Sequence, residues 1–144
     1  MPDKQILLIE DNADDRDLTI LAFKKNGVPN PVAVAIDGAE ALTMLFRDGH
    51  EDQDIPALIL LDLYLPKIDG LEVLRRIRAD QRTRAVPVLI LTSGGEDKDL
   101  RAAYDLGANG SIRQPVVFSE FSEAVHTAGL FWLLLNQPPP DPQP

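Results

Sequence analysis

Short hydrophobic runs alternate along this chain with longer stretches in which hydrophobic residues recur every three or four positions. Runs of the first kind are typical of buried strands, and stretches of the second kind are typical of amphipathic helices. The predicted strands are Ile6–Ile9, Val32–Ala35, Ala57–Leu61, Val86–Leu91 and a weaker one near Gly110–Arg113. Five helices are predicted. The first ends near Asn26, the second ends near Arg47, the third runs from about Gly70 to Arg78, the fourth runs from about Asp97 to Leu106, and the last begins at Phe118.

The runs Leu58–Leu61 and Val88–Leu91 contain no polar residue. A strand with this pattern has both faces covered, as in a parallel sheet with helices on each side. The alternation of strands and helices therefore predicts an α/β fold, a doubly wound five-stranded parallel sheet with five helices, the last of them extended. In such folds the ligand site lies at the carboxyl ends of the strands, near the point where the strand order reverses.

Length and composition set limits on this fold. The chain has 144 residues, of which 44% are hydrophobic and 26% are charged, a balance typical of a globular domain. This length suits one domain and is short for two. We expect a domain over residues 1–135 that includes the extended last helix, then a proline-rich flexible tail over residues 136–144, with no appended DNA-binding module.

The formal net charge of -9 would repel nucleic-acid phosphates and anionic lipid headgroups. We therefore expect protein partners, with no nucleic acid and no membrane. The hydrophobic stretch near the N-terminus is too short for a signal peptide or a bilayer span. The absence of cysteine fits a reducing compartment, so the prediction is a cytoplasmic protein.

Polar residues capable of chemistry stand where the predicted strands end. Glu10 and Asp11 follow the first strand, Asp62 the third, Thr92 the fourth and Gln114 the fifth. Each of them alone has a simpler interpretation, because Asp, Asn and Thr commonly cap the helix that follows a strand. Taken together, the fold would bring Glu10, Asp11 and Asp62 to one edge of the sheet as neighbouring carboxylates.

Three neighbouring carboxylates repel one another strongly unless a cation joins them. Carboxylates, a backbone carbonyl and waters form the all-oxygen site that Mg2+ prefers, and a phosphoryl oxygen could supply a further ligand. Mn2+ would also be accepted by such a donor set. The sequence therefore predicts a divalent metal site at this edge.

The residues around these acids resemble the receiver-domain family of two-component signalling, from about Gln5 to Ala128. The resemblance is carried by the acidic segment Leu7–Asn12, the segment Leu60–Gly70 around Asp62, and the strand segment Val88–Ser93. The helix start Asp37–Leu42 and the turn Gly107–Gly110 are also similar to the family. Together these motifs span nearly the whole predicted domain.

The resemblance implies that Asp62 accepts a phosphoryl group from a phosphohistidine on a sensor histidine kinase. It also implies that Asp11 and Asp62 bind the metal directly, that Glu10 acts through water, and that the backbone carbonyl of Tyr64 supplies another ligand. Thr92 would donate its hydroxyl to the phosphoryl group. Such a protein is a phosphoacceptor and not an enzyme, because it promotes only its own phosphorylation and dephosphorylation.

Two positions depart from the family pattern. Gln114 stands where the family has a lysine that contacts the phosphoryl group, and Ser111 stands where the family often has a switching Tyr or Phe. Gln114 can still donate a hydrogen bond, although a neutral donor is weaker than a charged one. One alternative is therefore a pseudo-receiver, an interaction module whose contacts do not depend on Asp62. A metal-dependent phosphatase with Asp62 as its nucleophile is a third functional class. Such an enzyme would need a second acid nearby as proton donor, but the residue two positions after Asp62 is Tyr64.

The predicted last helix has one hydrophobic face for the sheet and further hydrophobic residues on its other sides. The further residues are Leu130, Phe131, Leu133 and Leu134, and a contiguous patch of this kind usually marks an interface. The segment could instead fold back over the sheet as extra core. The ending Phe131–Pro140 resembles that of single-domain response regulators paired with phytochrome sensor kinases, which implies a homodimer and a bacterial phytochrome as the kinase partner.

Overall fold

The computed structural model describes residues 4–25, 27–46, 55–92 and 97–113. The predicted last helix from Phe118, the tail over residues 136–144 and Gln114 lie outside these residues. The same holds for the predicted interface residues Leu130, Phe131, Leu133 and Leu134.

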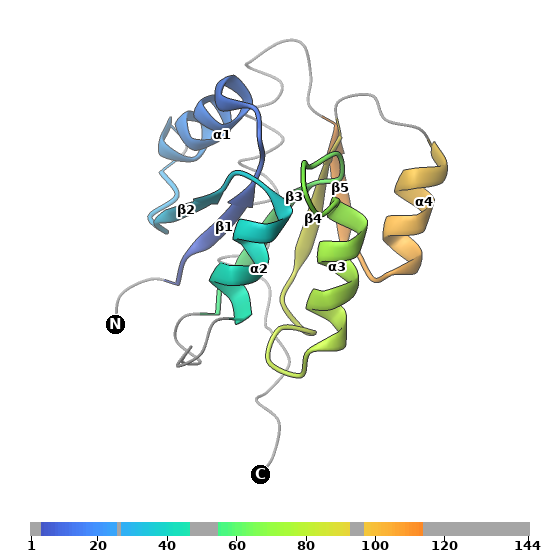
Figure 1. Ribbon diagram of the computed structural model, residues 1–144. Coiled ribbons are helices and arrows are strands. Elements are labelled where there is room, and N and C mark those ends of the chain that lie inside the picture. The colour runs from blue at the N-terminus through green and yellow to red at the C-terminus, as the bar shows by residue number, and fades with distance from the viewer. Residues whose placement is uncertain (1–3, 26, 47–54, 93–96, 114–144) are drawn as a thin grey trace.

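Five strands form one parallel sheet at the centre of the fold (Figure 1). They are β1 (Ile6–Ile9), β2 (Val32–Ala35), β3 (Leu58–Asp62), β4 (Val88–Thr92) and β5 (Gly110–Arg113), in the order β2-β1-β3-β4-β5. The chain passes from β1 to β2 on one side and then crosses to β3 on the other side of β1. The strand order therefore reverses between β1 and β3, where Ile9 pairs with Leu61.

Four helices cover the sheet in the described part of the chain, and α2 and α3 lie in front of the strands in Figure 1. The helices are α1 (Ala13–Lys25), α2 (Gly38–Phe46), α3 (Gly70–Ala79) and α4 (Asp97–Asp105). Helix α1 packs Ala22 and Phe23 on one face, and the other three helices pack on the opposite face. None of these four helices is long and apolar enough to cross a membrane. The arrangement confirms the doubly wound α/β fold.

Alternate residues of the central strands point to opposite faces, so each strand contributes to two cores. In β1, Leu7 and Ile9 pack under α2 and α3, while Ile6 and Leu8 pack under α1. All four side chains are buried, as the unbroken hydrophobic run predicts. Burying one such side chain contributes roughly 2 kcal/mol to folding. The packed strands therefore hold their carboxyl ends, and the polar residues there, in fixed positions.

Strands β3 and β4 differ from the sequence prediction at both ends, since β3 begins and ends one residue later, and β4 begins two residues later and ends one residue later. Strand β4 begins at Val88 instead of Val86, because the Val86 N–H donates to the carbonyl of Thr83 at 3.0 Å in the turn after α3. Pro87 follows and has no N–H to donate to a neighbouring strand. Strand β3 extends one residue further than predicted because Asp62 still pairs with Leu91 of β4. The acid at the end of β3 is therefore part of the sheet itself.

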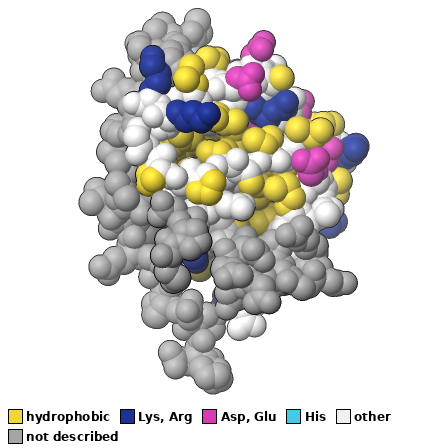
Figure 2. All heavy atoms as spheres, turned by 90° about the vertical axis from the view of Figure 1, so that its left-hand side faces the viewer, with side chains coloured by type: hydrophobic (Ala, Val, Ile, Leu, Met, Phe, Trp, Pro, Cys, Tyr) yellow, Lys and Arg dark blue, Asp and Glu magenta, His cyan; other side chains and the backbone are white. Residues whose placement is uncertain are grey.

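Strand β2 is an outer strand, and its side chains are less covered than those of β1. Val32, Ala33 and Val34 are half-buried, and Ile36 just after the strand is exposed. Figure 2 shows this side of the molecule, where α1 and β2 lie, with hydrophobic side chains spread among charged ones. The hydrophobic positions at this edge therefore remain partly open to water.

Candidate functional site

Three acids meet at the carboxyl edge of the sheet, beside the point where the strand order reverses. Glu10 and Asp11 follow β1, Asp62 ends β3, and one carboxylate oxygen from each lies within 4.8 Å of the other two. Glu10 is only 1% exposed, Asp62 is half-buried and Asp11 is exposed. The structure thus brings together the three acids that the sequence suggests as metal ligands.

The helix-capping interpretation does not hold for Asp11. Helix α1 is capped by Asn12, whose Oδ1 accepts a hydrogen bond from the Asp15 N–H at 2.9 Å. The Asn12 carbonyl also accepts the first helical hydrogen bond, from the Arg16 N–H at 3.0 Å. Because its neighbour caps the helix, the Asp11 side chain is left to the acidic cluster.

Asp62 does not cap a helix either. Its Oδ1 accepts a hydrogen bond from the Tyr64 N–H at 3.0 Å, which forms an Asx-type turn at the end of β3. The cap of α3 is Asp69, whose Oδ1 accepts from the Glu72 N–H at 3.0 Å. One oxygen of Asp62 therefore orders the following loop, while its carboxylate stays beside the other two acids.

The loop between β3 and α3 packs against the starts of two helices. A Cβ on Gly70, the first residue of α3, would lie 2.5 Å from the carbonyl oxygen of Asp62 and 2.6 Å from the Cα of Leu63. A Cβ on Gly38, the first residue of α2, would collide with the carbonyl oxygen of Ile68. Glycine at both positions permits these close backbone approaches. The loop after Asp62 is thereby seated between α2 and α3.

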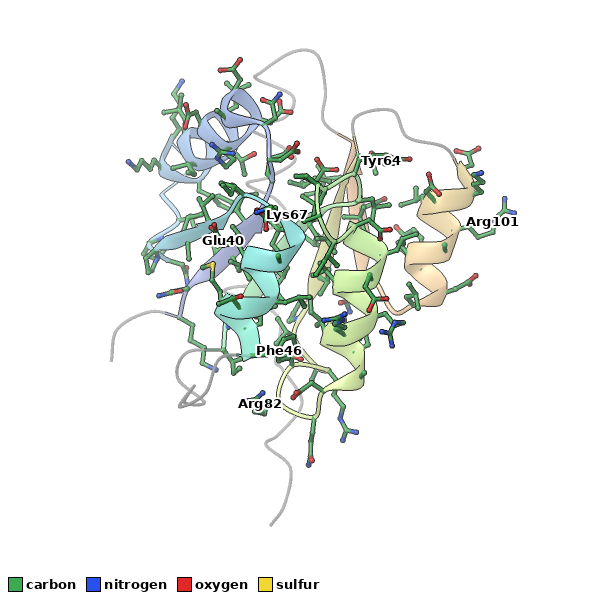
Figure 3. All side chains as sticks on the ribbon, viewed as in Figure 1. Glu40, Phe46, Tyr64, Lys67, Arg82 and Arg101 are labelled. Carbon is green, nitrogen blue, oxygen red and sulfur yellow. The ribbon has the colours of Figure 1, made fainter. Side chains whose placement is uncertain are left out.

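Lys67, in the same loop, forms an ion pair with the capping residue of α2. Its Nζ lies 3.3 Å from Asp37 Oδ2, and Figure 3 shows Lys67 directed toward the start of α2. Asp37 Oδ1 accepts from the Glu40 N–H at 2.7 Å. The pKa of Asp37 is lowered by this N–H first and by the Lys67 ammonium as well, against the opposing effect of burial. Lys67 therefore anchors the loop to α2.

Arg16 brings a positive charge to the acidic edge, and sequence reasoning missed it. Its Nη1 group donates to the carbonyl oxygens of Glu10 at 3.1 Å and of Asp11 at 3.0 Å. Arg16 lies one helical turn after the cap Asn12, so its side chain is directed back over the junction between β1 and α1. That spacing is the one signal in the sequence that could have identified it.

Tyr64 links the loop to α4. Its hydroxyl donates to Asp99 Oδ2 at 2.6 Å, and Asp99 lies in the first turn of α4. Figure 3 shows Tyr64 at the same end of the sheet as the start of this helix. The Tyr64 residue is thus held at two points, through its N–H on Asp62 and through its hydroxyl on Asp99.

Thr92 and Ser111 lie on the two strands beyond β3, and Gln114 lies outside the described residues. Thr92 ends β4 and directly follows Leu91, the residue paired with Asp62. Ser111 in β5 accepts a hydrogen bond from the Tyr104 hydroxyl at 3.1 Å. The aromatic ring that reaches Ser111 therefore comes from α4.

The electrostatic potential around the acidic cluster is negative. The pKa of Asp15 is raised by burial and by the charges of Asp62, Asp14 and Asp11. A divalent cation between the clustered carboxylates would offset their mutual repulsion. One buried, one half-buried and one exposed acid make an all-oxygen set that leaves room for water, which suits Mg2+. The residues present therefore fit a divalent metal.

A family model for the response regulator receiver domain matches residues 6–126. The probable methanogenesis regulatory protein FilR2 of Methanothrix harundinacea is 37% identical over 134 residues, which cover 93% of this chain and 86% of that protein. The response regulator Rcp1 of Synechocystis is 34% identical over 133 residues, which cover 92% of this chain and 90% of that protein.

Solved structures show the same similarity. The phosphorylated cyanobacterial phytochrome response regulator RcpA matches with a TM-score of 0.84 at 34% identity, over 96% of this chain and 99% of that chain. The bacteriophytochrome response regulator RtBRR matches with a TM-score of 0.74 at 44% identity, over 96% of this chain and 86% of that chain. The Mn2+-bound form of Rcp1 has a TM-score of 0.83 at 32% identity, over 95% of this chain and 99% of that chain.

Proposed function

The chain belongs to the response regulator receiver domain family, and from this premise we propose that Asp62 accepts a phosphoryl group at a divalent metal site. The observation that carries the proposal is the cluster of Glu10, Asp11 and Asp62, whose ligand oxygens lie within 4.8 Å of one another. The donor is a phosphohistidine of a sensor histidine kinase. The protein is then a signalling phosphoacceptor that promotes only its own phosphorylation and dephosphorylation.

In the proposed step, one oxygen of the Asp62 carboxylate attacks the phosphorus atom of the donor. A P–O bond forms, the P–N bond breaks, and the electron pair of that bond remains on the histidine nitrogen. The Tyr64 N–H, at 3.0 Å from Asp62 Oδ1, fixes the rotation of the carboxylate before the reaction. When bound, the metal supplies positive charge to the equatorial phosphoryl oxygens.

The proposed metal ligands are the carboxylates of Asp11 and Asp62, Glu10 through water, and the backbone carbonyl of Tyr64. The fixed loop geometry supports the last of these, because Tyr64 is held both by Asp62 and by Asp99. Mg2+ is the proposed ion, and Mn2+ would serve as well. Rcp1, a relative crystallised in a Mn2+-bound form, supports this choice of metal.

Thr92 is proposed to donate its hydroxyl to a phosphoryl oxygen. That contact exists only in the phosphorylated state, and a contact present in one state alone shifts the balance between two conformations. Gln114 is proposed to donate an amide hydrogen bond to the same group, in place of the lysine of the family. A neutral bond of this kind is roughly half as strong as a charged one. The phosphorylated state is therefore less stabilised than it would be with lysine.

The kinase partner is proposed to be a bacterial phytochrome, supported by the similarity to RcpA and RtBRR. A homodimer through Leu130, Phe131, Leu133 and Leu134 is proposed from the hydrophobic pattern of the last helix. We assign the receiver domain to residues 1–135 and a flexible tail to residues 136–144, and we place the protein in the cytoplasm.

Intact-protein mass measured after incubation with Mg2+ and acetyl phosphate tests the proposal. The wild type should gain the mass of one phosphoryl group, and Asp62→Asn should gain none. Asp69→Asn is the matched control, since it changes an exposed acid of the same loop to another good cap and should gain mass like the wild type. A wild type that gains no mass with acetyl phosphate or with a cognate kinase would favour the pseudo-receiver.

A further inference from the structure

Arg16 ties helix α1 back to the end of strand β1. Both hydrogens of its Nη1 group have an acceptor, the carbonyl of Glu10 at 3.1 Å and the carbonyl of Asp11 at 3.0 Å. We propose that Arg16 is a positioning residue for the metal site, because it fixes the backbone that presents these two acids. This inference rests on the proposed function and adds a residue to it.

The contacts of Arg16 complete a set of restraints on the turn between β1 and α1. The Glu10 N–H donates to the carbonyl of Ala35 in β2 at 3.0 Å, so Glu10 is held at both its N–H and its carbonyl. Asn12 is held to α1 through its side chain and its carbonyl. Between them, the Asp11 carbonyl is held by Arg16. Without the guanidinium, the peptide units of Glu10 and Asp11 would each lose a restraint.

An arginine suits this task better than a neutral side chain would. A charged donor forms hydrogen bonds that are roughly twice as strong as neutral ones. The guanidinium is also planar and rigid, so two bonds from one nitrogen fix the spacing of two successive carbonyls. Groups that orient metal-ligating residues without contacting the metal themselves typically contribute strongly to metal affinity. The geometry thus matches a supporting role for the acids.

Arg16 exerts two effects of opposite sign on a cation bound by Glu10 and Asp11. Its positive charge repels the cation, so loss of the charge alone would tighten binding. Its hydrogen bonds preform the turn, so their loss would weaken binding. Arg16 is only half-buried, so water and salt screen the repulsion between its charge and the cation. They weaken the restraint that its hydrogen bonds place on the turn to a smaller extent. We therefore expect the positioning effect to dominate.

The test is calorimetric titration of the unphosphorylated full chain with Mg2+. Arg16→Met should raise the dissociation constant roughly tenfold, and Arg16→Lys, which keeps the charge, should fall between this variant and the wild type. Lys24→Met removes a positive charge from an exposed position in the last turn of the same helix and should leave the constant unchanged. The rise in Arg16→Met should persist at high salt, because salt screens only the opposing charge effect and leaves the loss of positioning in place.

Thermal unfolding without metal shows whether each variant is folded. If Arg16→Met is not folded, the Mg2+ affinity of Arg16→Lys is compared with that of the wild type instead. Tighter Mg2+ binding in Arg16→Met would show that the charge dominates and would overturn the inference. An unchanged dissociation constant in a folded Arg16→Met would show that Arg16 does not position the metal ligands and would also overturn it. A wild type that binds no Mg2+ would contradict the proposed metal site itself, which Asp11→Asn tests separately.

Discussion

Arg78 joins three segments at the end of the sheet opposite the acidic cluster. It lies near the end of α3, and its guanidinium donates four hydrogen bonds. The acceptors are the carbonyls of Gly107 at 2.9 Å, Arg84 at 3.0 Å and Val86 at 2.8 Å, and Asn109 Oδ1 at 2.8 Å. Asn109 Oδ1 also accepts from the Val88 N–H at 2.9 Å, so the same network fixes the start of β4. We expect this network to stabilise the fold without touching the site.

Arg78→Met removes the four hydrogen bonds but keeps a hydrophobic stem of similar length. The bond to Val86 is partly buried and contributes about 1.5 kcal/mol, while the three exposed bonds contribute about 0.5 kcal/mol each. Burial of the guanidinium opposes this gain and lowers the pKa of Arg78. The expected net loss is therefore about 2 kcal/mol in the free energy of unfolding, or roughly 6 °C in Tm for a domain of this size.

Urea unfolding followed by circular dichroism measures this loss, with Arg84→Met as the matched control. The Arg84 side chain is exposed, and only its carbonyl takes part in the network. Arg84→Met should therefore change the free energy of unfolding by no more than about 0.5 kcal/mol. A loss in Arg78→Met no larger than the loss in Arg84→Met would refute the reasoning. The Mg2+ affinity of both variants should equal that of the wild type.

Three further changes test other parts of the structure. Gly38→Ala should lower Tm and slow phosphorylation, because the new Cβ meets the carbonyl of Ile68 and displaces the loop; a melting curve and a mass time course check both. Lys67→Met should lose less stability than the wild type between about pH 6 and about pH 3 in urea titrations. The pKa of Asp37 is lowered in the folded state, which stabilises the fold when the pH is above the ordinary pKa of this carboxyl, and acidification removes that stabilisation. Gln114→Lys should raise the yield of phosphorylated chain, because a charged donor binds the phosphoryl group more strongly; an unchanged yield and lifetime would show that this position matters little.

The fold follows from the sequence because the strands are buried on both faces. The run over Ile6–Ile9 predicts β1 correctly, and the same reasoning predicts the edge at which Glu10, Asp11 and Asp62 meet. Hydrophobicity alone misplaces the start of β4, since Val86 is buried in a turn and not in a strand. Burial was therefore predictable from the pattern, but the backbone conformation of each buried residue was not.

The contacts around the acids were less predictable, because they join residues far apart in the chain. Tyr64 and Asp99 are separated by 35 positions, and no periodic pattern relates them. The aromatic ring beside Ser111 comes from Tyr104, so a search restricted to β5 finds only the serine. Both pairs depend on how α4 is placed against the sheet, which the sequence of that helix alone does not specify.

Localisation of the phosphoryl group tests the central claim most directly. The full chain is incubated with Mg2+ and acetyl phosphate, reduced with borohydride to convert an aspartyl phosphate into homoserine, digested, and sequenced by mass spectrometry. We predict homoserine at position 62 and nowhere else, and none when a chelator replaces Mg2+. Homoserine at Asp11 instead, or a peptide around Asp62 that stays unmodified under every phosphodonor, would contradict the assignment of Asp62 as the phosphoacceptor.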